Sequence, residues 1–153
     1  MAVANNITQV SGYAFASNTL TKITFGENSQ LTTIGVYAFT AAYQLSSINI
    51  PDSVVSIGEG AFLDSVVSEI TFGENSQLSV IGDKAFAVTG VSSLILSSTV
   101  TNIGEDAFSW GSYLSEITYK GTRAQWNAIN FNSAWNSSNT ITKVICSDGI
   151  INL

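Results

Sequence analysis

A short motif recurs along this chain at a nearly constant interval. It consists of an isoleucine and a glycine, two variable residues, and then an alanine and a phenylalanine. The phenylalanines of its five copies lie 22 to 24 residues apart: Phe15, Phe39, Phe62, Phe86 and Phe108. In the first copy, Val10 and Ser11 replace the isoleucine and the glycine. A recurrence of this length indicates stacked repeats, each forming one coil of a solenoid.

A second pattern lies between these motifs and has the form apolar-x-x-apolar-x-apolar. Its last two apolar residues alternate with polar ones, which is the period of a half-buried strand. Because every coil runs the same way, these strands should form a parallel sheet with a spacing of about 4.8 Å. The pattern predicts one strand in each coil, near residues 22–25, 47–50, 69–72, 93–96 and 116–119.

Together the two patterns predict an α/β repeat solenoid. We expect a right-handed coil with a parallel β-sheet on one face and short helical or 3₁₀ turns on the other, the turns being formed by the alanine-phenylalanine segments. The phenylalanines should stack into one buried ladder. The recurring glycine should lie where φ is positive or where coils approach closely.

Successive coils also differ in length. The segments 23–34 and 70–81 are nearly identical and each contains the turn Gly-Glu-Asn-Ser-Gln, while the coils that follow them have shorter turns after Ile50 and Leu96. The larger unit of the repeat is therefore a pair of unequal coils, 47 residues long.

The pattern changes after Tyr119, and this predicts five coils over residues 1–121 and a C-terminal cap over residues 122–153 of the same domain. Thr122 and Gln125 have the spacing of a capping box and should begin a short helix that carries Trp126 and Ile129. Residues 144–146 should form a last strand that covers the open end of the sheet.

These residues resemble a known family. The strand pattern, the Ile-Gly-x-x-Ala-Phe segments and the closing Lys-Gly-Thr-x-x-Gln-Trp-x-x-Ile element of residues 120–129 resemble the BspA-like, or treponemal-type, leucine-rich repeats, over residues 9–146. The resemblance implies an exported surface protein of bacteria or some protists, with a role in adhesion to host matrix proteins or other cells. It implies no catalytic residues, and it does not identify the ligand.

The charge and composition of the chain limit the classes of partner that it can bind. Only 10% of the residues are charged and the net charge is −6, so nucleic acid and anionic membrane surfaces are not expected partners. No apolar run is long enough to span a bilayer, and residues 1–6 lack the features of a signal peptide. We therefore expect an extracellular or cell-surface location, with this sequence as a mature or excised segment of a longer protein.

The residue types argue against catalysis. The chain has no histidine, and its single cysteine, Cys146, lies on an apolar strand where a buried structural thiol is expected. The carboxylates that follow the recurring glycines should line a solvated outer edge rather than bind a cation: Glu59, Asp83, Glu105 and Asp106. We expect no enzyme activity, no catalytic residue, no metal and no cofactor.

The remaining candidates are binding surfaces. Two columns of outward-facing residues should lie on the concave face of the sheet: Lys22, Ser47, Glu69, Ser93 and Glu116, beside Thr24, Asn49, Thr71, Ile95 and Thr118. We expect a protein ligand there, either a host matrix protein or another cell-surface protein. Two alternatives stay open: a structural spacer in a larger surface protein, and a carbohydrate-binding module that uses Trp110, Trp126 and Trp135, although these tryptophans are better explained as a lid on the last coil.

Overall fold

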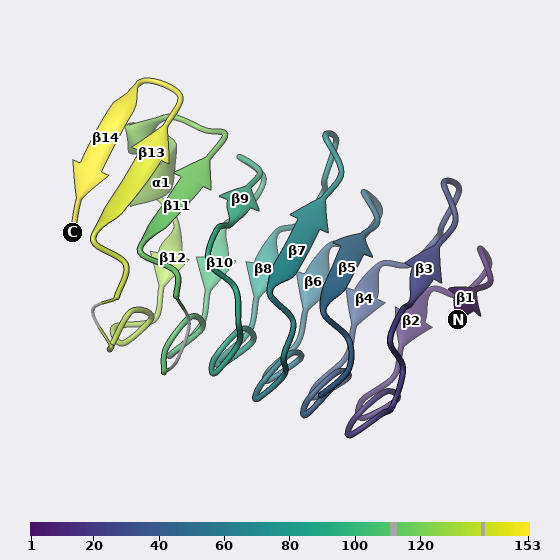
Figure 1. Ribbon diagram of the computed structural model, residues 1–153. Coiled ribbons are helices and arrows are strands. Elements are labelled where there is room, and N and C mark those ends of the chain that lie inside the picture. The colour runs from purple at the N-terminus through teal and green to yellow at the C-terminus, as the bar shows by residue number, and fades with distance from the viewer. Residues whose placement is uncertain (111–112, 139) are drawn as a thin grey trace.

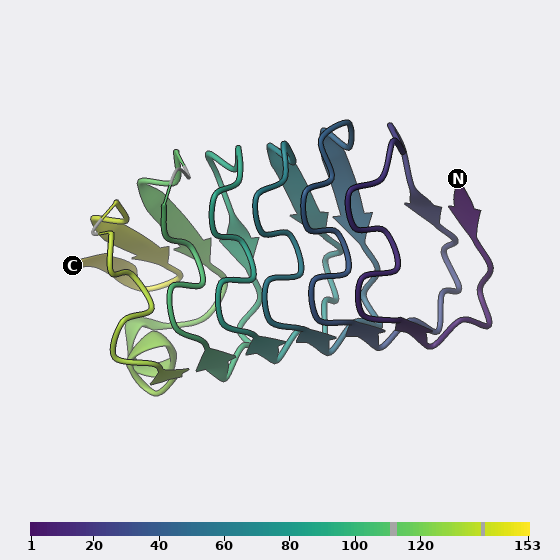
Figure 2. The same cartoon turned by 90° about the horizontal axis from the view of Figure 1, so that it is seen from below.

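The chain forms a parallel β-solenoid of stacked coils, with its two termini at opposite ends of the stack (Figure 1). The computed structural model describes residues 1–110, 113–138 and 140–153. Each coil contributes a strand to a front row and a two-residue strand to a back row, and Figure 2 shows the two rows on different sides of the stack.

The front row contains the strands predicted from the sequence, and those that pair from coil to coil do so in parallel. Its members are β1 (Ala2–Val3), β3 (Thr24–Phe25), β5 (Ser47–Ile50), β7 (Glu69–Phe72), β9 (Ile95–Leu96), β11 (Glu116–Tyr119), β13 (Lys143–Cys146) and β14 (Gly149–Asn152). Strand β13 is the predicted last strand. Beyond it, β14 returns antiparallel to β13 and closes the C-terminal end.

Strand pairing along the front row is interrupted twice. Among the described residues the row divides into β1-β3, β5-β7 and β9-β11-β13-β14. Each interruption follows a strand that ends in the longer Gly-Glu-Asn-Ser-Gln turn, since β3 and β7 precede Gly26 and Gly73. The longer turns in the sequence therefore correspond to the two breaks in the sheet, after β3 and after β7.

The back row is one continuous parallel sheet of six strands, which the sequence did not reveal. Its members are β2 (Gln9–Val10), β4 (Thr33–Ile34), β6 (Ser56–Ile57), β8 (Val80–Ile81), β10 (Asn102–Ile103) and β12 (Asn130–Phe131). The expectation of an α/β solenoid is thus confirmed only as a parallel repeat solenoid. Apart from the short helix α1 (Arg123–Asn127), the regular structure in the described part of the chain is sheet.

The alanine-phenylalanine segments form turns and not the predicted helical pieces. In the second coil, Tyr37 and Ala41 have φ of 53°, which a right-handed helix does not allow. Alternate backbone N–H groups of this segment donate to the next coil, as Tyr37 does to Glu59 at 2.8 Å and Phe39 to Ala61 at 2.7 Å. Helices need these N–H groups for bonds within the segment, so stacking of the coils takes the place of local helix formation.

The predicted phenylalanine ladder is present in the core. The rings of Phe15, Phe39, Phe62, Phe86 and Phe108 stack with centroid separations of 5.2, 5.2, 5.5 and 5.7 Å. All are buried except Phe15, which is partly buried at the N-terminal end of the ladder. Trp135 packs edge-on against Phe108 at 6.2 Å and ends the ladder at its other end.

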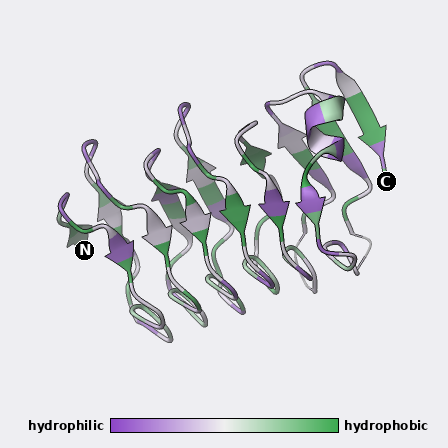
Figure 3. Ribbon diagram, turned by 180° about the vertical axis from the view of Figure 1, so that it is seen from behind, coloured by the Kyte–Doolittle hydropathy of each residue, from purple (hydrophilic) through white to green (hydrophobic). Residues whose placement is uncertain are grey.

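The C-terminal cap begins with the predicted capping box. The Thr122 hydroxyl accepts from the backbone N–H of Gln125, and the Gln125 side chain accepts from the backbone N–H of Thr122. Helix α1 places Trp126 in the core, where it is 2% exposed. In contrast to the buried Trp126, hydrophilic residues lie at the tips of the turns that follow the front strands (Figure 3). Strands β12 and β13 continue the back and front rows, so residues 122–153 add a further coil that β14 closes.

Candidate interaction surface

The outward-facing side chains of the front row are aligned from coil to coil. Strand register places Ser47 beside Glu69 and Asn49 beside Thr71, and it places Thr118 beside Ile95. The predicted surface residues are exposed, apart from Glu116 and Thr118, which are half-buried. We call this surface the front face: Lys22, Thr24, Ser47, Asn49, Glu69, Thr71, Ser93, Ile95, Glu116 and Thr118. A role in binding for these residues stays a prediction.

Strand β13 extends the front face by one coil and changes its charge. Lys143 lies in register with Glu116, and their side chains form an ion pair with an N–O distance of 2.7 Å. Glu69 is in neither of the ion pairs found among the described residues. The sequence reasoning recognised the last strand but did not add Lys143 to the column, although the alternation Lys-Val-Ile-Cys gave the signal.

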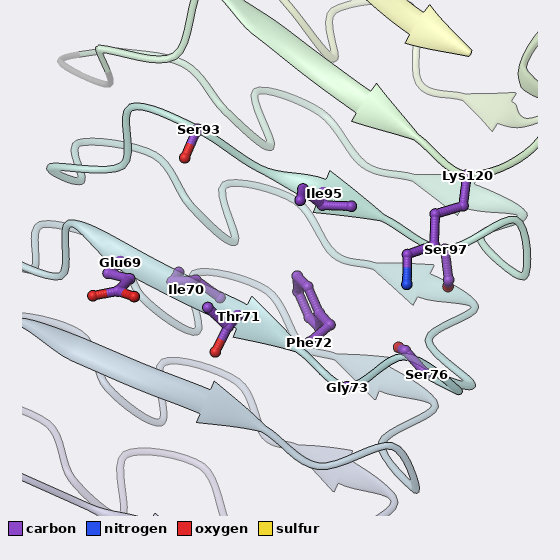
Figure 4. A pocket seen from close by; sticks show the side chains of 10 residues that line it. All are labelled: Glu69, Ile70, Thr71, Phe72, Gly73, Ser76, Ser93, Ile95, Ser97 and Lys120. Atoms are coloured by element: carbon purple, nitrogen blue, oxygen red, sulfur yellow. The ribbon is translucent and has the colours of Figure 1, made fainter. Parts of the chain in front are cut away.

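A groove lies on the front face between β7 and β9, at the second interruption of the sheet. We call it the β7–β9 groove; its volume is about 230 Å³. It is lined in its middle by Phe72 and Ile95 and at its ends by charged residues, with Glu69 at one end and Lys120 at the other (Figure 4). Sequence reasoning missed this groove, because a strand pattern does not reveal which neighbouring strands are paired.

The carboxylates after the recurring glycines are bound to neighbouring groups of the protein. Glu59 accepts a hydrogen bond from the Tyr37 hydroxyl at 2.7 Å, and Asp83 accepts one from the backbone N–H of Glu105 at 2.8 Å. Asp106 contradicts the prediction of a solvated edge, because it is only 6% exposed and accepts from the Ser137 hydroxyl. The cap covers this coil, so its carboxylate is enclosed.

Hydrogen bonds and burial explain the raised pKa values of two tyrosines and of Cys146. The hydrogen bond from Tyr37 to Glu59 raises the pKa of Tyr37, and the hydrogen bond from Tyr43 to Asp64 does the same for Tyr43. Burial raises the pKa of the Cys146 thiol, and Asp148 adds to this effect while Arg123 opposes it. Cys146 is buried, as predicted, and its raised pKa favours the unreactive thiol form.

The three tryptophans do not form one surface. Trp126 is buried, and its ring packs edge-on against partly buried Trp135 at 5.9 Å. Trp110 is 50% exposed. Two of the three therefore serve as the lid on the last coil, and a stacking platform for sugars built from all three is not present.

Two further features of the described residues concern metals and membranes. No group of three or more histidine, cysteine, aspartate or glutamate side chains is arranged to hold a metal ion within residues 1–110, 113–138 and 140–153. The same residues include no helix with the length and apolar character needed to cross a bilayer.

The fold and its aligned outward side chains define a class of protein, the leucine-rich-repeat solenoid with a repeat-built surface. More particularly, the chain belongs to the BspA-type leucine-rich repeat region family, whose pattern matches residues 32–152 in six copies. No curated protein matches the chain significantly.

Two solved structures are similar to this chain. One is the pneumococcal vaccine antigen PcpA, with a TM-score of 0.73 and 26% identity over 78% of this chain and 30% of that one. The other is a leucine-rich repeat protein from Eubacterium ventriosum ATCC 27560, with a TM-score of 0.64, 21% identity, and coverage of 82% of this chain and 31% of that one. The chain thus spans less than a third of the length of either protein, and the second likeness concerns the fold alone.

Proposed function

We propose that this chain is a non-catalytic binding module of a cell-surface protein and that its front face binds a protein partner. The observation that carries the proposal is the alignment of outward side chains across successive front strands. Such a surface is held by the solenoid core, so little ordering of the receptor is needed when a partner binds. Family membership and the similarity to a vaccine antigen support a surface location.

The character of the front face favours a protein partner. Most of its side chains are small, polar and uncharged, as in the contact between the Thr71 hydroxyl and the Asn49 side chain at 3.1 Å. Because these side chains are small, the shape of the backbone and of the groove determines which partner fits the front face. Adhesion to host matrix or to another cell would be one use of such binding.

A binding screen tests the proposal. The chain would be immobilised and offered matrix proteins, other cell-surface proteins and glycans. We expect capture of at least one protein, and we expect Thr71→Arg to weaken that capture about tenfold by placing a bulky charge in the interface. Thr101→Arg is the matched control, because Thr101 is an exposed threonine beside the back-row strand β10.

The outcomes separate the alternatives. Equal weakening by both threonine variants would contradict binding through the front face. Capture of glycans alone would favour a carbohydrate-binding module, and exposed Trp110 would be the first residue to replace. An intact chain that captures nothing would favour the structural spacer.

A further inference from the structure

The β7–β9 groove differs from the rest of the front face because its apolar floor is accessible. Phe72 occupies the strand position at which Ile50, Leu96 and Tyr119 are at most 2% exposed, yet Phe72 is only partly buried. Ile95, on the other side of the groove, is 54% exposed. The break in strand pairing after β7 uncovers one apolar ring and leaves an aliphatic side chain beside it.

The two ends of the groove carry opposite charges. Figure 4 shows Glu69 and Ser93 at the end where the strands begin, and Lys120, Ser97 and Ser76 at the end where they finish. Among the described residues, the Lys120 ammonium makes one long hydrogen bond, to the carbonyl oxygen of Glu74 at 3.4 Å. An ammonium has three N–H donors, so this contact leaves donors for an incoming anion.

The length of the groove along β7 matches the side-chain period of an extended peptide. Lys120 follows Tyr119, which is in register with Leu96, and so lies level with the turn that follows β7. Glu69 and Gly73 are four residues apart, which is about 13 Å at 3.3 Å per residue. On an extended peptide, side chains at positions i, i+2 and i+4 project from one face over the same distance.

From this geometry we infer that the β7–β9 groove binds an extended peptide segment with a basic, an apolar and an acidic side chain at alternate positions. The basic side chain lies at Glu69, the apolar one on Phe72 and Ile95, and the acidic one at Lys120. Strand β9 lies beside β7 without pairing with it, so the peptide lies over the groove and is held through its side chains. The inference rests on the proposed function and specifies the partner segment.

The first interruption of the front row provides an internal comparison. The groove between β3 and β5 has a volume of about 430 Å³ and is lined by Phe25 at the position equivalent to Phe72. It has Asn49 where the β7–β9 groove has Ile95, and the charged residues among its described lining are Glu27 and Asp52. It therefore lacks both the exposed aliphatic side chain of the Ile95 position and the cation, and the same peptide should not bind there.

The test is a titration of the isotopically labelled chain with the peptide acetyl-Ser-Lys-Thr-Leu-Thr-Glu-Ser-amide, followed by NMR. We expect amide shifts in β7, in β9 and at Lys120, and none around Phe25. Ile95→Ser should weaken binding about tenfold through lost apolar contact. Lys120→Glu should weaken it about fivefold, and Lys84→Glu, the same exchange on a lysine in an alanine-phenylalanine turn outside the front face, should leave it unchanged.

A charge exchange checks that the contact is direct. Lys120→Glu should prefer the peptide in which the glutamate is replaced by lysine, reversing the preference of the natural chain. Peptide binding without shifts in β7 and β9, or equal effects of the two lysine variants, would overturn the inference. Binding of an oligosaccharide in place of the peptide would overturn the ligand class. If no peptide binds while the screen still captures a protein through Thr71, the groove assignment fails and the proposed function stands.

Discussion

The glycine after each buried isoleucine of the back sheet is required by contact between coils. A Cβ atom at Gly82 would lie 2.7 Å from the backbone nitrogen of Glu59, in the preceding coil. Positive φ occurs elsewhere, at the second residue after the glycine, as at Tyr37 and Lys84. The sequence predicted two possible causes for this glycine without separating them, because recurrence alone gives no distance between coils.

Replacement of Gly82 by alanine should therefore destabilise the chain. We expect a loss of about 1–3 kcal/mol in the free energy of unfolding, because the added methyl group meets backbone atoms that cannot move without disturbing the next coil. Urea denaturation measures the loss. Gly90→Ala is the control, since the atom nearest to its Cβ is the Ser68 Cβ at 3.2 Å. Similar losses for the two variants would contradict the closer approach of backbone atoms at Gly82 as the cause.

The buried thiol gives the stability of the chain a dependence on pH. The pKa of Cys146 is raised in the folded chain above its ordinary value of 9.0, so the folded state holds the proton more tightly than the unfolded state. This contribution is fully present below pH 9 and is lost as the pH rises through the folded pKa. The difference in the free energy of unfolding between the natural chain and Cys146→Ala should accordingly narrow as the pH rises above 9. If the difference in the free energy of unfolding did not change with pH, the buried thiol would not be the source of the pH dependence.

The elements of the fold differ in how clearly the sequence predicts them. Front strands such as β5 alternate buried and exposed residues and were predicted correctly, as was the capping box of α1. Back strands such as β4 have only two residues, too few to show a period. The turns beyond them were wrongly predicted as helical. Their backbone hydrogen bonds join one coil to the next, and a local sequence pattern does not show such bonds. Local sequence therefore predicts the elements whose signal lies within one coil.

The phenylalanine ladder should contribute unequally along its length. Phe62 stacks between Phe39 and Phe86 at 5.2 and 5.5 Å and is fully buried, so Phe62→Ala should cost about 3–5 kcal/mol of stability. Phe15 contacts only one ring of the ladder and is partly buried, and Phe15→Ala should cost less. Thermal or urea unfolding measures both. A loss below about 1 kcal/mol for Phe62→Ala would contradict a ladder that holds adjacent coils together.

At the scale of the whole molecule, the surface is built by addition of coils. Each coil contacts mainly its neighbours, so every outward position becomes a column and each irregularity in coil length is repeated. The columns were predictable because they require only the period. The ion pair of Glu116 with Lys143 and the β7–β9 groove were not, since both depend on how a particular coil meets the next. These departures from the repeat give the front face its individual features.

The uneven charge of the front face leads to a prediction for association with a basic protein partner. Glu69 is exposed and outside the ion pairs, whereas the charge of Glu116 is compensated by Lys143 at 2.7 Å. Glu69→Lys should slow association at low salt more than Glu116→Lys does, and added salt should reduce the difference. Stopped-flow or surface-based kinetics at two salt concentrations measure both rates. Glu69→Gln should show an intermediate rate, because it removes the negative charge without adding a positive one. Equal rates for all these variants at low salt would place the contact surface away from the front face.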